Sequence, residues 1–156
     1  MRLYADTGIF VALYLDESHR NPVQKLIAET QPHFWVTPLL QAEWSHAVFQ
    51  RVSDKTLAAN EARQIMAEFD RDRENGRWNQ SPIPRNAVER SMALAREHHG
   101  PQATTSDTLH VAIALELRAA QFWTLSPQAA ALAAAVNLSV VRPSMDKNAP
   151  RVRSRR

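Results

Sequence analysis

Residues 3–15 read LYADTGIFVALYL, which is a short apolar run, an acidic residue and a longer apolar segment in succession. Leu3–Ala5 is typical of a short buried strand, and residues 7–15 carry a helical pattern. Asp6 stands between them, and a carboxylate near a core is unfavourable unless it is paired, hydrogen-bonded or bound to a cation. The stretch therefore predicts a strand–helix unit whose junction holds an acidic residue, either as a helix N-cap or as part of a site.

The same order of short strand and longer helix recurs along the chain. Further strands are expected at residues 34–37, 122–125 and 138–141, each apolar or β-branched and bounded by turn or capping residues. Helical patterns cover residues 7–15, 19–30, 38–53, 57–74, 85–98, 107–119 and 127–136. Strands separated by helices predict an α/β fold, a three-layer α/β/α sandwich around a parallel sheet of about four strands.

Length and composition fit one globular domain. The chain has 156 residues, 44% hydrophobic and 22% charged, which predicts a single domain over residues 1–145. It has no cysteine, so disulfides and thiolate metal sites are excluded. The early apolar run at 9–15 is too short for a membrane span and lacks the flanks of a signal peptide. We therefore expect a cytoplasmic protein that does not enter the membrane.

The net charge of +3 comes from the carboxyl-terminal end of the sequence. Residues 151–156 contain four arginines and no acid, which leaves 15 basic and 16 acidic residues elsewhere, a net charge of −1. We predict that 146–156 is a basic, disordered tail. Contact with nucleic acid or an acidic partner and a purely solubilising role both remain open for it.

Three acidic residues lie where packing alone would not favour them. Asp6 follows the first strand, Glu43 borders the apolar face of a helix, and Asp107 opens an apolar helix. Each has a structural interpretation as well. Asp6 fits an N-cap, Asp107 complements a helix dipole, and Glu43 could pair with a buried arginine. Three such carboxylates, each near the end of an element, nevertheless suggest one shared task.

That task is predicted at one edge of the sheet. Ligands of open parallel sheets bind beyond the carboxyl ends of the strands, where Asp6 and Ser126 follow two expected strands. We expect Asp6, Glu43 and Asp107 to converge there, with their carboxylates within about 8 Å of one another, because hard cations such as Mg²⁺ take oxygen ligands.

Several segments resemble, in chain order, those of PIN-domain ribonucleases. They are YADT at residues 4–7, TPLLQAE at 37–43, SDTLHVA at 106–112, FWTLS at 122–126 and NLSVV at 137–141. Each motif is weak alone, but the set covers nearly the whole chain. Its length and single domain look like those of VapC-type toxins of bacterial toxin–antitoxin pairs.

The resemblance implies a Mg²⁺-dependent endoribonuclease, with Mn²⁺ able to substitute, that acts as the toxin of a type II pair. Asp6, Glu43 and Asp107 would be its catalytic residues and metal ligands. Where the family often has a fourth acid, this chain has Ser126. The resemblance leaves Ser126 and Thr7 as contacts to a phosphate or to a water on the metal.

The resemblance also implies partners. They are an RNA substrate, a second copy of the chain in a homodimer, and a small antitoxin that covers the groove and a helical hairpin at 38–74. Ile65, Met66 and Phe69 form an apolar stripe on that hairpin for such a partner.

Two other classes of protein remain open. One is a degenerate PIN-like module that binds RNA or protein without catalysis. The other is a di-iron carboxylate protein, because Glu43-x-x-His46 and Asp107-x-x-His110 have the spacing used in helical bundles. That site requires about four long core helices. A hydrogen-bonded core histidine is the simpler interpretation of His110.

Overall fold

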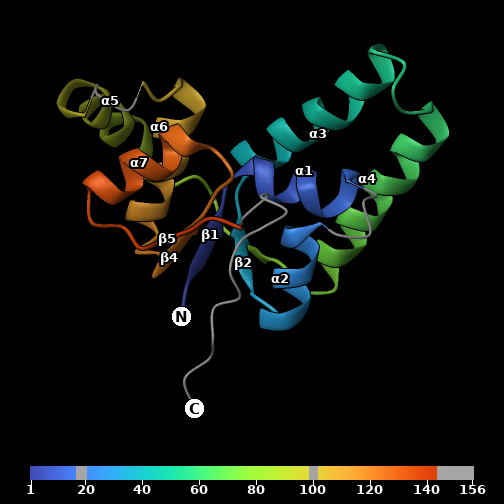
Figure 1. Ribbon diagram of the computed structural model, residues 1–156, viewed down its shortest axis with the longest axis horizontal. Coiled ribbons are helices and arrows are strands. Elements are labelled where there is room, and N and C mark those ends of the chain that lie inside the picture. The colour runs from blue at the N-terminus through green and yellow to red at the C-terminus, as the bar shows by residue number, and fades with distance from the viewer. Residues whose placement is uncertain (17–20, 99–101, 144–156) are drawn as a thin grey trace.

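The computed structural model describes residues 1–16, 21–98 and 102–143, and within them the chain forms a parallel five-stranded sheet (Figure 1). The strand order is β3-β2-β1-β4-β5. The strands are β1 Leu3–Ala5, β2 Phe34–Val36, β3 Asn79–Gln80, β4 Gln121–Trp123 and β5 Val140–Val141. The parallel sheet is confirmed, with one more strand than expected. The added β3 is two polar residues paired with β2 through the backbone.

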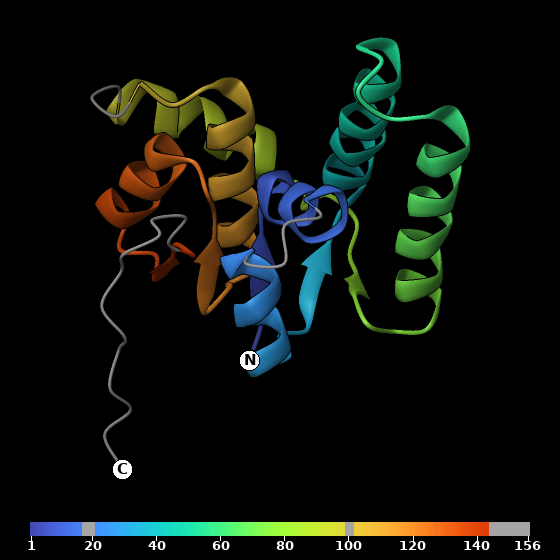
Figure 2. The ribbon, with the colours of Figure 1, turned by 45° about the vertical axis from the view of Figure 1, so that its right-hand side comes forward.

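Seven helices in the described residues cover the two faces of the sheet (Figures 1 and 2). They are α1 Thr7–Leu15, α2 Pro22–Thr30, α3 Pro38–Ser53, α4 Ala59–Glu74, α5 Ala87–Glu97, α6 Thr105–Glu116 and α7 Pro127–Ala135. Helices α1 to α4 pack with one another on one side, and α5 to α7 on the other. The predicted three-layer sandwich is therefore present.

Alternation along the strands separates two hydrophobic clusters, one on each face. Leu3 and Ala5 of β1 join the cluster under α1 to α4, whereas Tyr4 between them joins the cluster under α6 and α7. Trp123 and Phe122 of β4 divide in the same way. Because successive side chains of a strand point to opposite faces, a three-residue strand supplies both cores.

Helices α3 and α4 form the predicted hairpin, which projects from the sheet (Figure 2). The two helices meet through aromatic side chains: the ring centroids of Trp44 and Phe69 are separated by 5.4 Å. Phe69 is only 1% exposed and belongs to the core, so it is not part of a surface stripe as expected. Ile65 and Met66 are half-buried and keep some exposed area.

Two sequence expectations concern other parts of the chain. The predicted tail, 146–156, lies outside the described residues. Within residues 1–16, 21–98 and 102–143, no helix has both the length and the apolar character that a membrane crossing requires.

Candidate functional site

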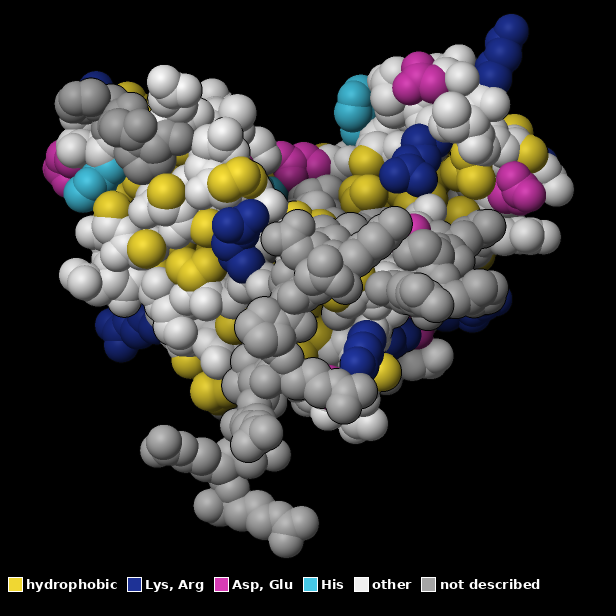
Figure 3. All heavy atoms as spheres, viewed as in Figure 1, with side chains coloured by type: hydrophobic (Ala, Val, Ile, Leu, Met, Phe, Trp, Pro, Cys, Tyr) yellow, Lys and Arg dark blue, Asp and Glu magenta, His cyan; other side chains and the backbone are white. Residues whose placement is uncertain are grey.

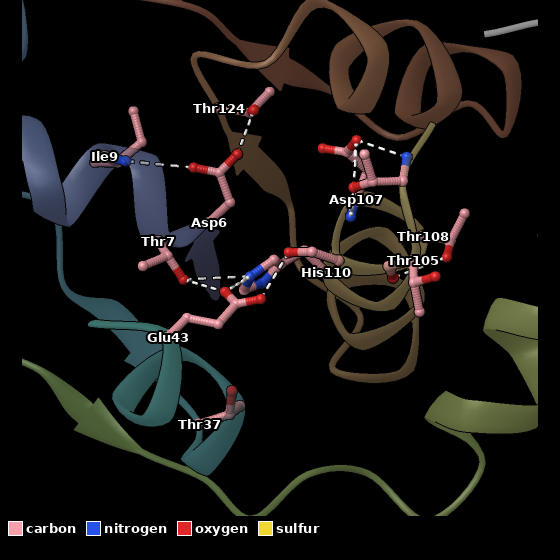
Figure 4. A network of polar contacts seen from close by, with 12 residues as sticks. Asp6, Thr7, Ile9, Thr37, Glu43, Thr105, Asp107, Thr108, His110 and Thr124 are labelled. Carbon is pink, nitrogen blue, oxygen red and sulfur yellow. Dashed lines mark hydrogen bonds and ion pairs between the residues drawn. The ribbon is translucent and has the colours of Figure 1, made fainter. Parts of the chain in front are cut away.

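Asp6 lies at the carboxyl end of β1, beside the end of β4 (Figure 4). It caps α1, because its Oδ1 accepts a hydrogen bond from the backbone N–H of Ile9 at 3.3 Å. Its Oδ2 accepts a hydrogen bond from the hydroxyl of Thr124. Asp6 is 7% exposed, so a nearly buried carboxylate faces the end of the sheet. Both sequence interpretations of Asp6, as cap and as site residue, are compatible with this position.

The environment of Asp6 disfavours its negative charge. Burial raises the pKa of Asp6, the hydrogen bond from Thr124, the charge of His110 and the Ile9 N–H oppose that rise, and the negative charge of Asp107 makes the smallest contribution to it. Asp6 and Asp107 lie at the same end of the sheet (Figure 4). Among the described residues, neither has an ion pair with lysine or arginine.

Asp107 sits in the first turn of α6, which begins at Thr105, two residues before the predicted start. Thr104 is the N-cap, and it donates through its backbone N–H and its hydroxyl to Asp107 Oδ2, each at 2.8 Å. This reciprocal capping box explains the earlier start. Within the described part of the chain, no hydrogen bond reaches Asp107 Oδ1.

Glu43, in the second turn of α3, accepts hydrogen bonds from three side chains of two other helices (Figure 4). Ser106 donates to Oε1 at 2.6 Å, while Thr7 and His110 Nε2 donate to Oε2, His110 at 2.7 Å. Partial burial would raise the pKa of Glu43, but the hydrogen bond and charge of His110, with Ser106 and Thr7, outweigh it and lower that pKa to about 2. Glu43 is therefore ionised, and no arginine of the described residues forms an ion pair with it.

A buried polar chain stands behind Glu43. The hydroxyl of Tyr4 lies 2.8 Å from His110 Nδ1 and 3.4 Å from the hydroxyl of Thr37. An ionised carboxylate only accepts hydrogen bonds, so His110 Nε2 carries the proton directed at Glu43, and Nδ1 shares a second hydrogen bond with the Tyr4 hydroxyl. Burial raises the pKa of Tyr4 and keeps its phenol protonated.

His110 was expected to be a hydrogen-bonded core residue, and that is confirmed. The residue is 2% exposed and bonded on both ring nitrogens. Its partners could not be found from sequence, since Tyr4 lies 106 positions away. His46, the other histidine of the di-iron spacing, is exposed on α3. The parallel sheet takes the place of the helical core that a di-iron site requires.

Ser126 is linked to the site through its backbone. Its N–H donates to the hydroxyl of Thr124 at 2.9 Å, and Thr124 in turn donates to Asp6. The Ser126 hydroxyl caps α7 by accepting from Ala129 N–H at 3.1 Å. The residue therefore stands at the predicted edge of the sheet, with its side chain engaged in the cap.

The three predicted acids thus lie on one edge of the sheet (Figure 4). The surface is hollowed between the α5–α7 side and the α3–α4 hairpin, with acidic side chains at the base of the hollow (Figure 3). In the described ranges, no three or more histidine, aspartate or glutamate side chains are grouped as a complete set of metal ligands. Asp6 and Asp107 are instead two carboxylates with which no lysine or arginine of the described residues forms an ion pair.

A model of the PIN domain matches residues 3–135. The chain belongs to the PIN domain family. A search of curated proteins found no match to this PIN domain. Similar solved structures do exist, and because each of the three below is less than 20% identical to this chain, they bear on the fold alone.

Three solved structures share the fold of this PIN domain. VapBC2 from Rickettsia felis, bound to a promoter DNA fragment, has a TM-score of 0.65 at 14% identity, covering 91% of this chain and 98% of that one. Mycobacterium tuberculosis VapC20, a sarcin–ricin loop cleaving toxin, has a TM-score of 0.64 at 12% identity, covering 83% and 93%. A toxin–antitoxin complex from Klebsiella pneumoniae has a TM-score of 0.59 at 19% identity, covering 92% and 98%.

Proposed function

We propose that this PIN-domain protein is a Mg²⁺-dependent endoribonuclease and the toxin of a type II toxin–antitoxin pair. The observation that carries the proposal is the pair Asp6 and Asp107 at the carboxyl end of the sheet. Burial and the negative charge of Asp107 raise the pKa of Asp6, and no lysine or arginine of the described residues forms an ion pair with either carboxylate. A cation removes that repulsion, and hard divalent cations prefer oxygen ligands.

The donor set fits Mg²⁺ rather than a softer metal. Mg²⁺ usually keeps several waters and is held by one or two carboxylates together with substrate phosphates. A pair of aspartates is therefore sufficient, although no group of three ligands exists among the described residues. Mn²⁺ has similar ligand preferences and should replace it. When bound, the cation would lower the pKa of a water molecule and act as a Lewis acid toward the phosphate.

The protein side chains then have distinct tasks. Thr124 and the first turn of α1 hold the Asp6 carboxylate by two hydrogen bonds. The Thr104 capping box fixes one oxygen of Asp107 and leaves the other for a ligand. Glu43 belongs to the same site, but a pKa of about 2 makes it a weak proton acceptor. Thr7, whose hydroxyl donates to Glu43, and Ser126, whose hydroxyl caps α7, stay the proposed contacts to a phosphate or a water.

The proposed partners follow from the same comparison. The similar structures come from toxin–antitoxin systems, which supports a small antitoxin as a partner of this chain. We place it over the acidic hollow and the α3–α4 hairpin, where an antitoxin arginine would pair with the grouped carboxylates. A homodimer and a cytoplasmic location remain part of the proposal.

Cleavage of structured RNA by the purified protein tests the activity. The protein should cut RNA in Mg²⁺ or Mn²⁺ and lose activity in EDTA. Asp6→Asn and Asp107→Asn should each reduce cleavage by at least about a hundredfold, because an amide is nearly isosteric but lacks the ligand charge. Ser91→Ala, which removes a buried hydroxyl bonded to Thr108 and leaves every hydrogen bond of the three acids in place, serves as the matched control. RNA binding without cleavage would instead favour the non-catalytic module.

A further inference from the structure

Two of the three side chains that donate hydrogen bonds to Glu43 are next to the aspartates in the sequence. Thr7 directly follows Asp6, and Ser106 directly precedes Asp107. Both hydroxyls donate to the Glu43 carboxylate, Ser106 to Oε1 and Thr7 to Oε2. Glu43 thereby links the side chain of the residue next to one aspartate to the side chain of the residue next to the other.

We infer that Glu43 is a brace that sets the separation of Asp6 and Asp107, and that His110 and Tyr4 are positioning residues that hold this brace. The inference rests on the proposed metal site at the two aspartates. In this inference the aspartates bind the metal, whereas Glu43 affects metal binding indirectly, through the residues next to the aspartates.

The hydrogen bonds to Glu43 favour bracing over direct ligation. Its Oε2 already accepts from Thr7 and from His110, and its Oε1 accepts from Ser106. A cation bound directly by Glu43 would have to displace donors from a half-buried carboxylate. Leaving a nearly buried histidine N–H without an acceptor carries a desolvation cost. Asp107, by contrast, keeps one oxygen free of hydrogen bonds from the described residues.

Tyr4 and His110 hold the Glu43 carboxylate in position. The completely buried Tyr4 hydroxyl lies 2.8 Å from His110 Nδ1, and on the other side of the ring His110 Nε2 directs its proton at Glu43. The ring is locked between a strand of the sheet and helix α3. Outer partners of this kind commonly change metal affinity by 10- to 100-fold when they are removed.

The spacing of the two aspartates matters because Mg²⁺ and its close analogues require a near-octahedral arrangement at short distances. Asp6 and Asp107 belong to elements that are far apart in the sequence. Helix α1 packs mainly on α3 and α2, and α6 packs mainly on α5 and α7. Glu43 joins both helices to α3 at the level of the acids, so loosening it should let the two carboxylates separate.

Mn²⁺ affinity, measured by calorimetry without RNA, tests the brace. Tyr4→Phe removes one oxygen atom and keeps the ring, so the fold should persist. It should weaken Mn²⁺ binding by about tenfold, as should His110→Gln and Glu43→Gln, whereas Asp6→Asn should abolish binding. Ser91→Ala, the control for loss of a buried hydroxyl, should bind like the wild type. Wild-type affinity in Tyr4→Phe, with Glu43→Gln as impaired as Asp6→Asn, would overturn the brace and make Glu43 a ligand.

A measurement without metal separates this inference from the proposed activity. In the wild type, ¹⁵N spectra should show His110 protonated at Nε2 with its exchange slowed. Tyr4→Phe should redistribute that proton and shift the backbone amides of both Thr7 and Asp107, whereas Ser91→Ala should leave Thr7 unchanged. A His110 proton on Nδ1 alone, or amide shifts on the α6 side only, would refute the brace. If Mn²⁺ binding does not depend on Asp6, the proposed metal site is wrong. The spectra of the metal-free protein would still show whether Glu43 acts as a brace.

Discussion

Thr124 donates a hydrogen bond to the carboxylate of Asp6 across 118 positions of sequence. The bond joins the end of β4 to the end of β1, the central strand of the sheet. It supplies part of the stabilisation that an ionised, nearly buried carboxylate needs, but the pKa of Asp6 is still raised. The metal-free protein therefore carries an electrostatic cost at this position.

Asp6→Asn should stabilise the metal-free protein at neutral pH by about 1–2 kcal/mol, because it removes a buried charge beside Asp107. A carboxyl whose folded pKa is raised contributes stability below its unfolded pKa, and that contribution disappears as the pH rises through the folded value. The advantage of the variant should thus vanish near pH 3–4. Urea unfolding in EDTA from pH 4 to 8 measures it, and an equal difference at every pH would contradict the electrostatic explanation.

Glu43 should show the opposite dependence. Its folded pKa of about 2 lies below the ordinary value of 4.5, so its contribution is present above pH 4.5 and is lost as the pH falls toward 2. Water partly screens this half-buried group, and we expect about 1–2 kcal/mol. Glu43→Gln should therefore lose less stability than the wild type between pH 5 and pH 3. Parallel acid-unfolding curves for the two proteins would show that the hydrogen bonds of Glu43 add no net stability.

Ser126→Asp should tighten Mn²⁺ binding, because it adds a carboxylate next to Thr124 and Asp6. Aspartate is as good an N-cap as serine, so α7 should keep its first turn. Calorimetry should show an affinity gain of about tenfold over the wild type. Ser126→Asn, which caps equally well without charge, is the control, and equal affinity in both variants would place residue 126 outside the site.

Phe69→Ala should lower the free energy of unfolding by about 3–5 kcal/mol, because the side chain fills the core between α1, α3 and α4. Met66→Ala, one turn away and half-buried, should cost less than half as much. Urea unfolding of the two variants makes the comparison. Similar costs would mean that the hairpin core is looser than the ring contacts of Phe69 with Phe10, Tyr14 and Trp44 indicate.

Deletion of residues 151–156 tests the basic tail, which stays a prediction from sequence. The four arginines of the tail should contribute to RNA affinity through phosphates. Its removal should reduce the slope of log affinity against log salt by about three at most. An unchanged slope would leave the tail a solubilising end.

The sequence correctly predicted those helices and strands whose pattern lies within a single segment of the chain. Apolar strands next to capping residues, such as Leu3–Ala5 before Asp6, were identified because burial and capping are local patterns. Strand β3 was missed because Asn79–Gln80 is polar and gains its strand conformation only by pairing with β2. The partners of Glu43 were missed for a related reason. Spacing places Glu43 on a helix face, but which side chains it meets depends on how three helices dock.

The position of β1 in the middle of the sheet has a consequence for protein synthesis. As the chain leaves the ribosome, β1 can pair early with β2, but its other edge has no partner until β4 emerges more than a hundred residues later. Asp6 lacks Thr124 until then, and the Asp6–Asp107 pair also waits for the distant part of the chain. A prematurely terminated fragment that ends before α6 therefore holds an open strand edge and no carboxylate pair. Under the proposed function, a toxin built this way stays inactive until α6 and β4 have been synthesised.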